Sequence, residues 1–351
     1  MRNAITSRDE PRWQSEEAGE RIGRSSKLCR SGSPLLLVVL ASSSFNLTTL
    51  LINTRYLYER ESYNKAQDLI QVAFQHFPDK EGLAYAGALD LRGLIYLGTN
   101  HPARALEDFT AALIVRQQLL GPDDALIGSS LNNLGLAYTE TNDLAQAKNF
   151  HDQAIELRLR INSERIGDSY GNMSSTLLRL GRPDEAEDMF FRRPSSKNLD
   201  EEMNQDTGNP RLSGDLMLLS RIQRQQGRLD DALHLASKAL SFRQSVLGNT
   251  PKTCDAMYLI ADLLHRKDKI ATARTLLYEC ITVAAGVPEA PGYLAKAQYK
   301  LGMLYILDGD LQGGAAYINA ARSNRDVMLG HTTPVEREEG SFEKLVPWML
   351  W

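Results

Sequence analysis

Few residues of this chain are grouped in a way that could support catalysis. The stretch Ser62-Tyr63-Asn64-Lys65 matches S-x-x-K, a spacing in which a lysine can stand beside a serine nucleophile. The S-D-N and K-T-G companions of that chemistry are absent from the sequence. Acid pairs such as Asp123-Asp124 and Asp184-Glu185 stand at expected helix starts, where negative charge stabilises the helix dipole. The sequence therefore predicts no catalytic residue, and we expect the chain not to be an enzyme.

Metal and cofactor chemistry have no support in the sequence either. The six histidines are scattered without the spacing of metal ligands. No phosphate-binding P-loop, dinucleotide-binding glycine run, serine-hydrolase elbow or zinc-protease motif is present in the sequence. We therefore expect neither a bound metal nor a cofactor.

The dominant feature of the sequence is a pattern of small residues and tyrosines that returns about every 40 residues. A Gly-x-x-Tyr stretch is followed nine residues after the tyrosine by another small residue, and the offsets stay in register from copy to copy. The clearest members of this grid are Gly93, Tyr96, Ala105, Gly135, Tyr138, Ala147, Ala186, Ala232, Ala273, Gly302 and Tyr305. Antiparallel helices approach to about 8–10 Å only where the side chains at their crossing are small. The pattern therefore predicts stacked helical hairpins.

The position four residues after the second small residue carries a larger side chain that would fill the groove beside the crossing. It is Phe109 and Phe190 in two hairpins and His151 in a third. We therefore expect His151 to be a packed core residue. Cys280 stands at a small core position of its hairpin, which predicts a buried, reduced thiol and a reducing compartment.

This grid resembles the tetratricopeptide repeat, in particular the kinesin light chain type found in large fungal repeat arrays. Repeats of that type end in an arginine followed by a Leu-Gly turn, and similar tails occur here at Arg116–Gly121, Arg243–Gly248 and Arg325–Gly330. The run Leu131-Asn132-Asn133-Leu134-Gly135 is similar to the one that opens such repeats. The resemblance covers residues 47–330 and implies an all-α, right-handed superhelical solenoid of about seven helix pairs.

The grid also divides the chain into segments. We expect a disordered N-terminal segment, an apolar capping segment, two blocks of repeats separated by a polar flexible insert, and a C-terminal tail or cap. Their expected bounds are 1–33, 34–46, 47–193 for repeats 1–4, 194–212 for the insert, 213–330 for repeats 5–7, and 331–351. The apolar run in 34–46 is too short to span a membrane. The apolar tail either packs back on the final hairpin or is a peptide that a partner captures.

The resemblance also implies where a partner binds. In such arrays the asparagines of the opening run face a concave groove and hold the backbone of a bound peptide. The matching residues are Asn132, Asn133 and Asn172, although asparagines on a solvated helix face would fit the sequence equally. Repeats that grip chaperone C-terminal tails need cations at positions where this chain carries Asp90 and Asp168. Chaperone tails are therefore disfavoured as ligands.

Composition agrees with an interaction scaffold. A formal net charge of −4 with interspersed signs provides no basic field for nucleic acid, and no segment is long and apolar enough for a membrane span. We expect a non-catalytic cytoplasmic scaffold that binds a protein or peptide of unknown identity. The alternative is the sensor or regulatory repeat half of a nucleotide-binding signalling protein, whose NTPase domain would lie elsewhere.

Overall fold

The computed structural model describes residues 46–199, 210–332 and 338–348. The chain divides into two compact units, Met1–Pro78 and Asp79–Trp351. The described part of the first unit is one antiparallel helix pair, α3 (Leu47–Glu59) and α4 (Tyr63–Gln75). The helices cross where Thr54 and Ala66 are both fully buried.

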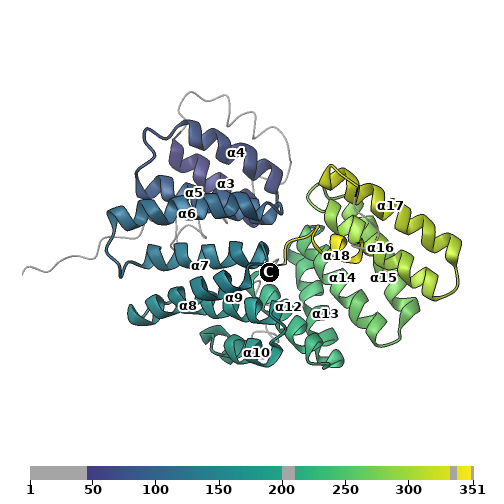
Figure 1. Cartoon of the computed structure of the whole chain (residues 1–351). Helices are drawn as coiled ribbons and strands as arrows, with labels where there is room; N and C mark the ends of the chain where they lie inside the picture. Colours follow the sequence, from purple (N-terminus) through teal and green to yellow (C-terminus); the bar gives the residue numbers. More distant parts are fainter. Residues whose placement is uncertain (1–45, 200–209, 333–337, 349–351) are drawn as a thin grey trace, which may run out of the picture. The chain divides into compact units, whose positions relative to one another are not determined.

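The second unit is a series of six helix pairs followed by a short C-terminal helix (Figure 1). The pairs are α5 (Leu83–Gly98) with α6 (Pro102–Leu119), α7 (Ala125–Glu140) with α8 (Leu144–Arg160), α9 (Ile166–Arg179) with α10 (Pro183–Phe191), α12 (Pro210–Gln225) with α13 (Leu229–Val246), α14 (Pro251–Arg266) with α15 (Ile270–Ala285), and α16 (Pro291–Leu307) with α17 (Leu311–Leu329). Helix α18 (Glu338–Glu343) follows, and a 3-10 turn, η2 (Pro194–Asn198), comes after α10. In all but one case, the second helix of a pair also packs broadly on the first helix of the next pair. The exception is α10, whose contact with α12 is smaller. Helices are the only regular secondary structure among the described residues, which confirms the predicted all-α fold of seven helix pairs.

Each hairpin turns through one residue in the left-handed backbone conformation. Glycine, asparagine and aspartate adopt this conformation most readily. The turn residues are Glu61, Asn100, Asn142, Gly181, Gly227, Asp268 and Gly309. Six of the seven are therefore of the types that a tight turn between helices favours.

The small residues of the grid lie where the helices approach most closely. A Cβ atom on Gly93 would overlap the ring of Phe109, and one on Gly302 would overlap Ile318 and the backbone of Gly314. A Cβ on Gly135 would overlap the His151 ring. The pattern of small residues therefore has the mechanical cause that the sequence indicates.

His151 fills the groove beside Gly135, as expected from its alignment with Phe109. The side chain is fully buried, and neither ring nitrogen has a hydrogen-bond partner among the described residues. Burial, with a smaller contribution from Arg158, lowers the pKa of His151 to about 3. The histidine is therefore a neutral packing residue.

The arginines near the ends of the second helices join successive hairpins. Arg116, Arg158, Arg243 and Arg325 are all almost completely buried. Arg158 Nη1 donates to Ser169 Oγ at the start of α9, and Arg243 Nη1 donates to the carbonyl of Lys252 at the start of α14. The repeat tails thus hold each second helix to the beginning of the next first helix.

Several expected segments lie partly outside the described residues. The expected segments 1–33 and 34–46 do so almost entirely, since the description begins at residue 46. Within the segment 194–212, which was expected to be a flexible insert, the structure has η2 at Pro194–Asn198 and the start of α12 at Pro210. Leu199 is buried in the core of the second unit, which explains why the chain remains structured beyond Pro194. Residues 200–209 lie outside the described residues.

Candidate functional site

The first helices of the second unit contact one another along one side. Helix α7 touches α5 and α9, α9 touches α12, and α14 touches α16. The polar side chains that join neighbouring first helices lie on one side of α5, α7, α9, α12, α14 and α16. We call this side the inner surface. Most of its polar side chains come from positions that recur at about one repeat spacing.

Two of the three predicted asparagines are buried in the inner surface. Asn132 is 6% exposed and Asn172 8% exposed. Asn172 Nδ2 donates to Asn132 Oδ1 over 3.0 Å, and Ser169 Oγ donates to the same oxygen over 3.2 Å. The solvated-face alternative therefore does not hold for these two residues, whose amides join α7 to α9.

Asn133 has a different environment. Its side chain is half-buried, and its Nδ2 donates to Asp90 Oδ1 on α5 over 3.1 Å. Asp90 also pairs with Arg116 at 2.5 Å. Burial raises the pKa of Asp90, although the Arg116 charge opposes that shift. Asn133 is thus the one of the three asparagines with a partly accessible side chain.

Ion pairs replace the asparagines in the second half of the inner surface. Arg221 Nη2 donates to both carboxylate oxygens of Asp255, at 2.6 and 2.7 Å. Asp262 accepts from Arg224 and Lys300, each at 3.0 Å. Burial alone would raise the pKa of Asp262, but Lys300 and Arg224 hold it below its ordinary value.

Sequence reasoning overlooked these ion pairs. A usable signal was present, because Arg224, Asp262 and Lys300 follow one another at intervals of 38 residues. Residues one repeat apart lie side by side on adjacent first helices.

The C-terminal segment packs first against the final hairpin. The ring of Phe342 stacks on Tyr299 with centroids 4.3 Å apart, and it is 1% exposed. The Arg325 guanidinium lies 5.0 Å from the centre of the same ring. Glu343 pairs with Lys296 of α16 at 2.7 Å. Helix α18 therefore covers the end of the array, which is one of the two arrangements considered for the tail.

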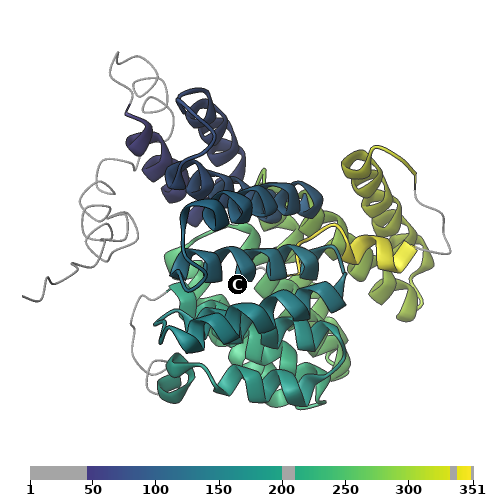
Figure 2. The same cartoon turned by 60° about the vertical axis from the view of Figure 1, so that its left-hand side comes forward.

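The segment then crosses to the early hairpins (Figures 1 and 2). The carbonyl of Lys344 accepts a hydrogen bond from Asn100 Nδ2 over 2.7 Å. The backbone N–H of Trp348 donates to Glu140 over 2.9 Å, and its indole Nε1 donates to Ser175 Oγ over 3.2 Å. Side chains of α7 and α9, together with Asn100 in the turn after α5, thus hold main-chain groups of this segment and the Trp348 indole.

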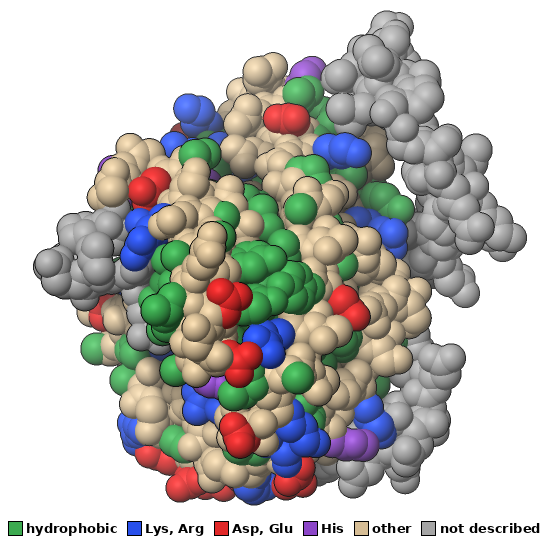
Figure 3. Space-filling view, turned by 90° about the vertical axis from the view of Figure 1, so that its right-hand side faces the viewer, with side chains coloured by type: hydrophobic (Ala, Val, Ile, Leu, Met, Phe, Trp, Pro, Cys, Tyr) green, Lys and Arg blue, Asp and Glu red, His purple; other side chains and the backbone are tan. Residues whose placement is uncertain are grey.

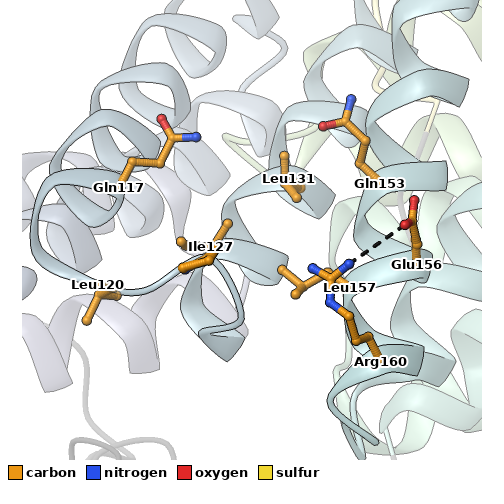
Figure 4. Close-up of a pocket in the computed structure, with 9 residues that line it drawn as sticks. Gln117, Leu120, Ile127, Leu131, Gln153, Glu156, Leu157 and Arg160 are labelled. Carbon is orange, nitrogen blue, oxygen red and sulfur yellow. Dashed lines mark ion pairs between the residues drawn. The ribbon is translucent and has the colours of Figure 1, made fainter.

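An open pocket of about 480 Å³ lies between α6, α7 and α8 (Figure 4). Ile127, Leu131 and Leu157 provide most of its apolar wall. Its charged residues, Glu156 and Arg160, are exposed and lie 3.7 Å apart. Such an exposed pair contributes little to binding, so this pocket has few groups that could orient a ligand.

The end of the array that carries α15 and α17 is viewed in Figure 3, where hydrophobic side chains gather near the centre of the face. On the final hairpin Leu307, Leu311 and Val327 are 65%, 66% and 80% exposed. These apolar side chains provide no polar group for orienting a ligand.

The described part of the chain contains no cluster of three or more His, Cys, Asp or Glu side chains that could hold a metal ion. In the same residues no helix combines the length and apolarity of a membrane span.

Three solved structures share the fold, each with a TM-score of 0.58. They are "NprR in complex with its cognate peptide NprX" (16% identity, covering 93% of this chain and 89% of that chain), "Rap Protein Complexed with Competence and Sporulation Factor" (12%, 94% and 96%), and the "Rap conjugation gene regulator of the plasmid pLS20 in complex with the Phr* peptide" (16%, 88% and 83%). None of the curated proteins matches the sequence. At these identities the likeness shows the fold.

The tetratricopeptide repeat family matches residues 85–160 and 215–286. These ranges cover α5–α8 and α12–α15, so the match agrees with the helix pairs and with the predicted grid. Residues 85–160 and 215–286 thus match tetratricopeptide repeats, and the remaining helix pairs share the same antiparallel arrangement.

Proposed function

We propose that this protein is a non-catalytic interaction scaffold whose inner surface binds an extended or helical segment of a partner protein. The observation that carries the proposal is the way in which this surface holds the chain's own residues 344–348. Asn100 binds a main-chain carbonyl of that segment, and Glu140 binds a main-chain N–H. Contacts to main-chain groups suit the recognition of a peptide, because every peptide offers them.

The structural comparisons support the same proposal. Two of the three similar structures are described as complexes with a peptide, NprX in one and Phr* in the other. The shared fold makes a peptide the reasonable class of ligand for this chain as well. A reducing cellular compartment agrees with the free, buried thiols of Cys254 and Cys280.

Within the inner surface we assign different roles to the three asparagines. Asn133 is the candidate for direct contact with a partner, because its amide is partly accessible and can both donate and accept. Asn132 and Asn172 are candidates for positioning, since their mutual hydrogen bond holds α7 against α9. We propose no nucleic acid ligand, because the chain has a formal net charge of −4.

A selection from a random peptide library on the immobilised full-length chain tests this function. The selection is run in parallel on the parent and on the Trp348→Ala chain, so that an occupied inner surface does not conceal binding. Selected peptides are then labelled and titrated by fluorescence anisotropy against Asn133→Ala. The matched control is Gln153→Ala, an exposed amide on α8.

We expect Asn133→Ala to weaken binding by roughly 2- to 10-fold, the size of one lost hydrogen bond, and Gln153→Ala to leave it unchanged. Equal binding to both variants would place the peptide site away from Asn133. Failure to select any peptide on either chain would contradict the proposed function itself.

A further inference from the structure

We propose that Glu140, Ser175 and Arg179 form a binding site for a tryptophan side chain, and that the C-terminal segment of the same chain fills it as an internal ligand. The second part rests on the proposed function: a partner peptide must displace this segment to reach the inner surface. The site is built by the ends of α7 and α9, and its occupant is Trp348.

Three different interactions surround Trp348. The Arg179 guanidinium lies 5.3 Å from the centre of the indole ring, within the range of a cation–π contact. Ser175 Oγ accepts from the indole N–H, and Glu140 accepts from the backbone N–H of the same residue. Ser175 is fully buried and the Glu140 side chain is 6% exposed, so both acceptors lie in a place shielded from water.

The hydrogen bond to Ser175 favours tryptophan over phenylalanine at this site. A phenylalanine ring could lie against Arg179, but it has no N–H to donate to the buried hydroxyl. Leaving a buried polar group without its partner is unfavourable. Arg179 is itself held in place, because it donates to the Thr139 carbonyl and lies 3.9 Å from Glu140.

The occupying segment has a firm anchor and a weakly held end. Phe342 and Leu345 are 1% and 3% exposed, and the Leu345 carbonyl passes so close to Gly292 that a Cβ there would overlap it. Val346, Pro347 and Trp348 are only half-buried. Segments with few buried contacts open at a lower free energy than the core. The Trp348 end can therefore leave the site while α18 remains on the final hairpin.

The covalent link gives the internal ligand its advantage over a free peptide. A tethered segment acts at an effective concentration in the millimolar range when its linker is short. Here the linker is short, because the stacking of Phe342 on Tyr299 anchors the chain only six residues before Trp348. A partner must then bind more tightly than the tail alone, or arrive with additional contacts.

Tryptophan fluorescence reports on the site directly. The chain contains three tryptophans, at positions 13, 348 and 351. In a full-length chain with Trp13→Phe and Trp351→Phe, acrylamide quenching follows Trp348 alone. Arg179→Gln and, separately, Ser175→Ala are compared with the control Arg160→Gln, which changes an exposed arginine of α8. Ser175→Ala keeps the test decisive if Arg179→Gln unfolds the chain.

We expect the quenching slope to rise at least about twofold in Ser175→Ala and Arg179→Gln, and to stay at the parent value in Arg160→Gln, because a released indole meets the quencher freely. An unchanged slope in Ser175→Ala, or a slope in the parent equal to that of the free 338–351 peptide carrying Trp351→Phe, would overturn the site.

Competition is measured with a fluorescent peptide of residues 338–351. We expect it to bind the Trp348→Ala chain at least about tenfold more tightly than the parent, because the parent site is already filled. The same peptide carrying Trp348→Phe should bind that chain more weakly. Equal affinity for parent and variant would overturn the internal-ligand proposal.

The peptides from the library selection separate the two proposals. If they bind the parent and the Trp348→Ala chain equally, displacement of the tail is wrong and the proposed function remains. If no library peptide binds either chain while Trp348 is protected from acrylamide, the proposed function fails and the tryptophan site remains.

Discussion

The guanidinium of Arg325 covers the ring of Phe342 and donates to Ser341, so that α18 begins where the next first helix of the array would begin. In the earlier hairpins the corresponding arginines donate to the starts of true first helices, as Arg158 does to Ser169. A solenoid needs a cap over its last apolar face. The terminal helix provides this cap by using the contact that joins the internal hairpins.

Removing the Phe342 ring is therefore expected to destabilise the array. Truncation of a fully buried phenylalanine costs about 3–5 kcal/mol, so Phe342→Ala should lower the midpoint of chemical denaturation. The matched control is Val327→Ala on α17, whose side chain is 80% exposed and should change stability by less than about 0.5 kcal/mol. Equal unfolding free energies for the two variants would show that α18 is no cap.

Gly135→Leu should destabilise the third hairpin. A Cβ at this position already overlaps the His151 ring, and overpacking a close crossing costs about 1–3 kcal/mol. Gly121→Ala is the control, because a Cβ on Gly121 meets nothing within 4 Å. Thermal unfolding of both variants measures the difference. A Gly135→Leu melt that overlays the parent curve would contradict the close approach of α7 and α8.

The stability of the protein should fall in acid through His151. The unfolded chain binds a proton on this residue near its ordinary pKa of 6.5, whereas the folded chain resists protonation down to a pKa of about 3. Between these values the unfolded state carries more protons, so stability decreases as the pH falls, by at most about 1.4 kcal/mol per pH unit. Above pH 6.5 the residue is neutral in both states and contributes no pH dependence.

Urea denaturation at several pH values from 7 to 4 measures this contribution. His151→Phe places the residue of the equivalent Phe109 position beside Gly135 and removes the titrating group. We expect the variant to lose less stability than the parent over this range. Parallel curves for the two proteins would mean that His151 does not titrate with unfolding.

Asp255→Ala should be strongly destabilising. The carboxylate pairs with Arg221 and lies 3.4 Å from Arg243, and both arginines are buried. Removing one partner of a buried ion pair leaves uncompensated charge and costs about 3–5 kcal/mol. The control Asp152→Ala breaks an exposed pair with Lys148, which contributes at most about 1 kcal/mol. Comparable losses in both variants would argue against the importance of burial at Asp255.

The positions of the helix crossings could be read from the sequence alone. The grid places one crossing at Gly135, where a Cβ on α7 would overlap the His151 ring of α8. This agreement has a local cause, because the spacing of Gly135, Tyr138 and Ala147 reflects one helix crossing within about a dozen residues. The spacing within the same hairpin also predicted that His151 is a core residue, and its side chain is fully buried.

Contacts between repeats and with the tail were decided only by the tertiary structure. The sequence marked Asn132 and Asn172 as candidates, but their mutual hydrogen bond joins residues 40 positions apart. The Trp348–Glu140 contact joins residues 208 positions apart. No periodicity encodes such a pair, because it depends on how the stacked hairpins bring distant surfaces together. The repeated sequence pattern determined the packing within each hairpin, because that packing joins residues close in sequence. The relative positions of the stacked hairpins determined where the C-terminal segment binds.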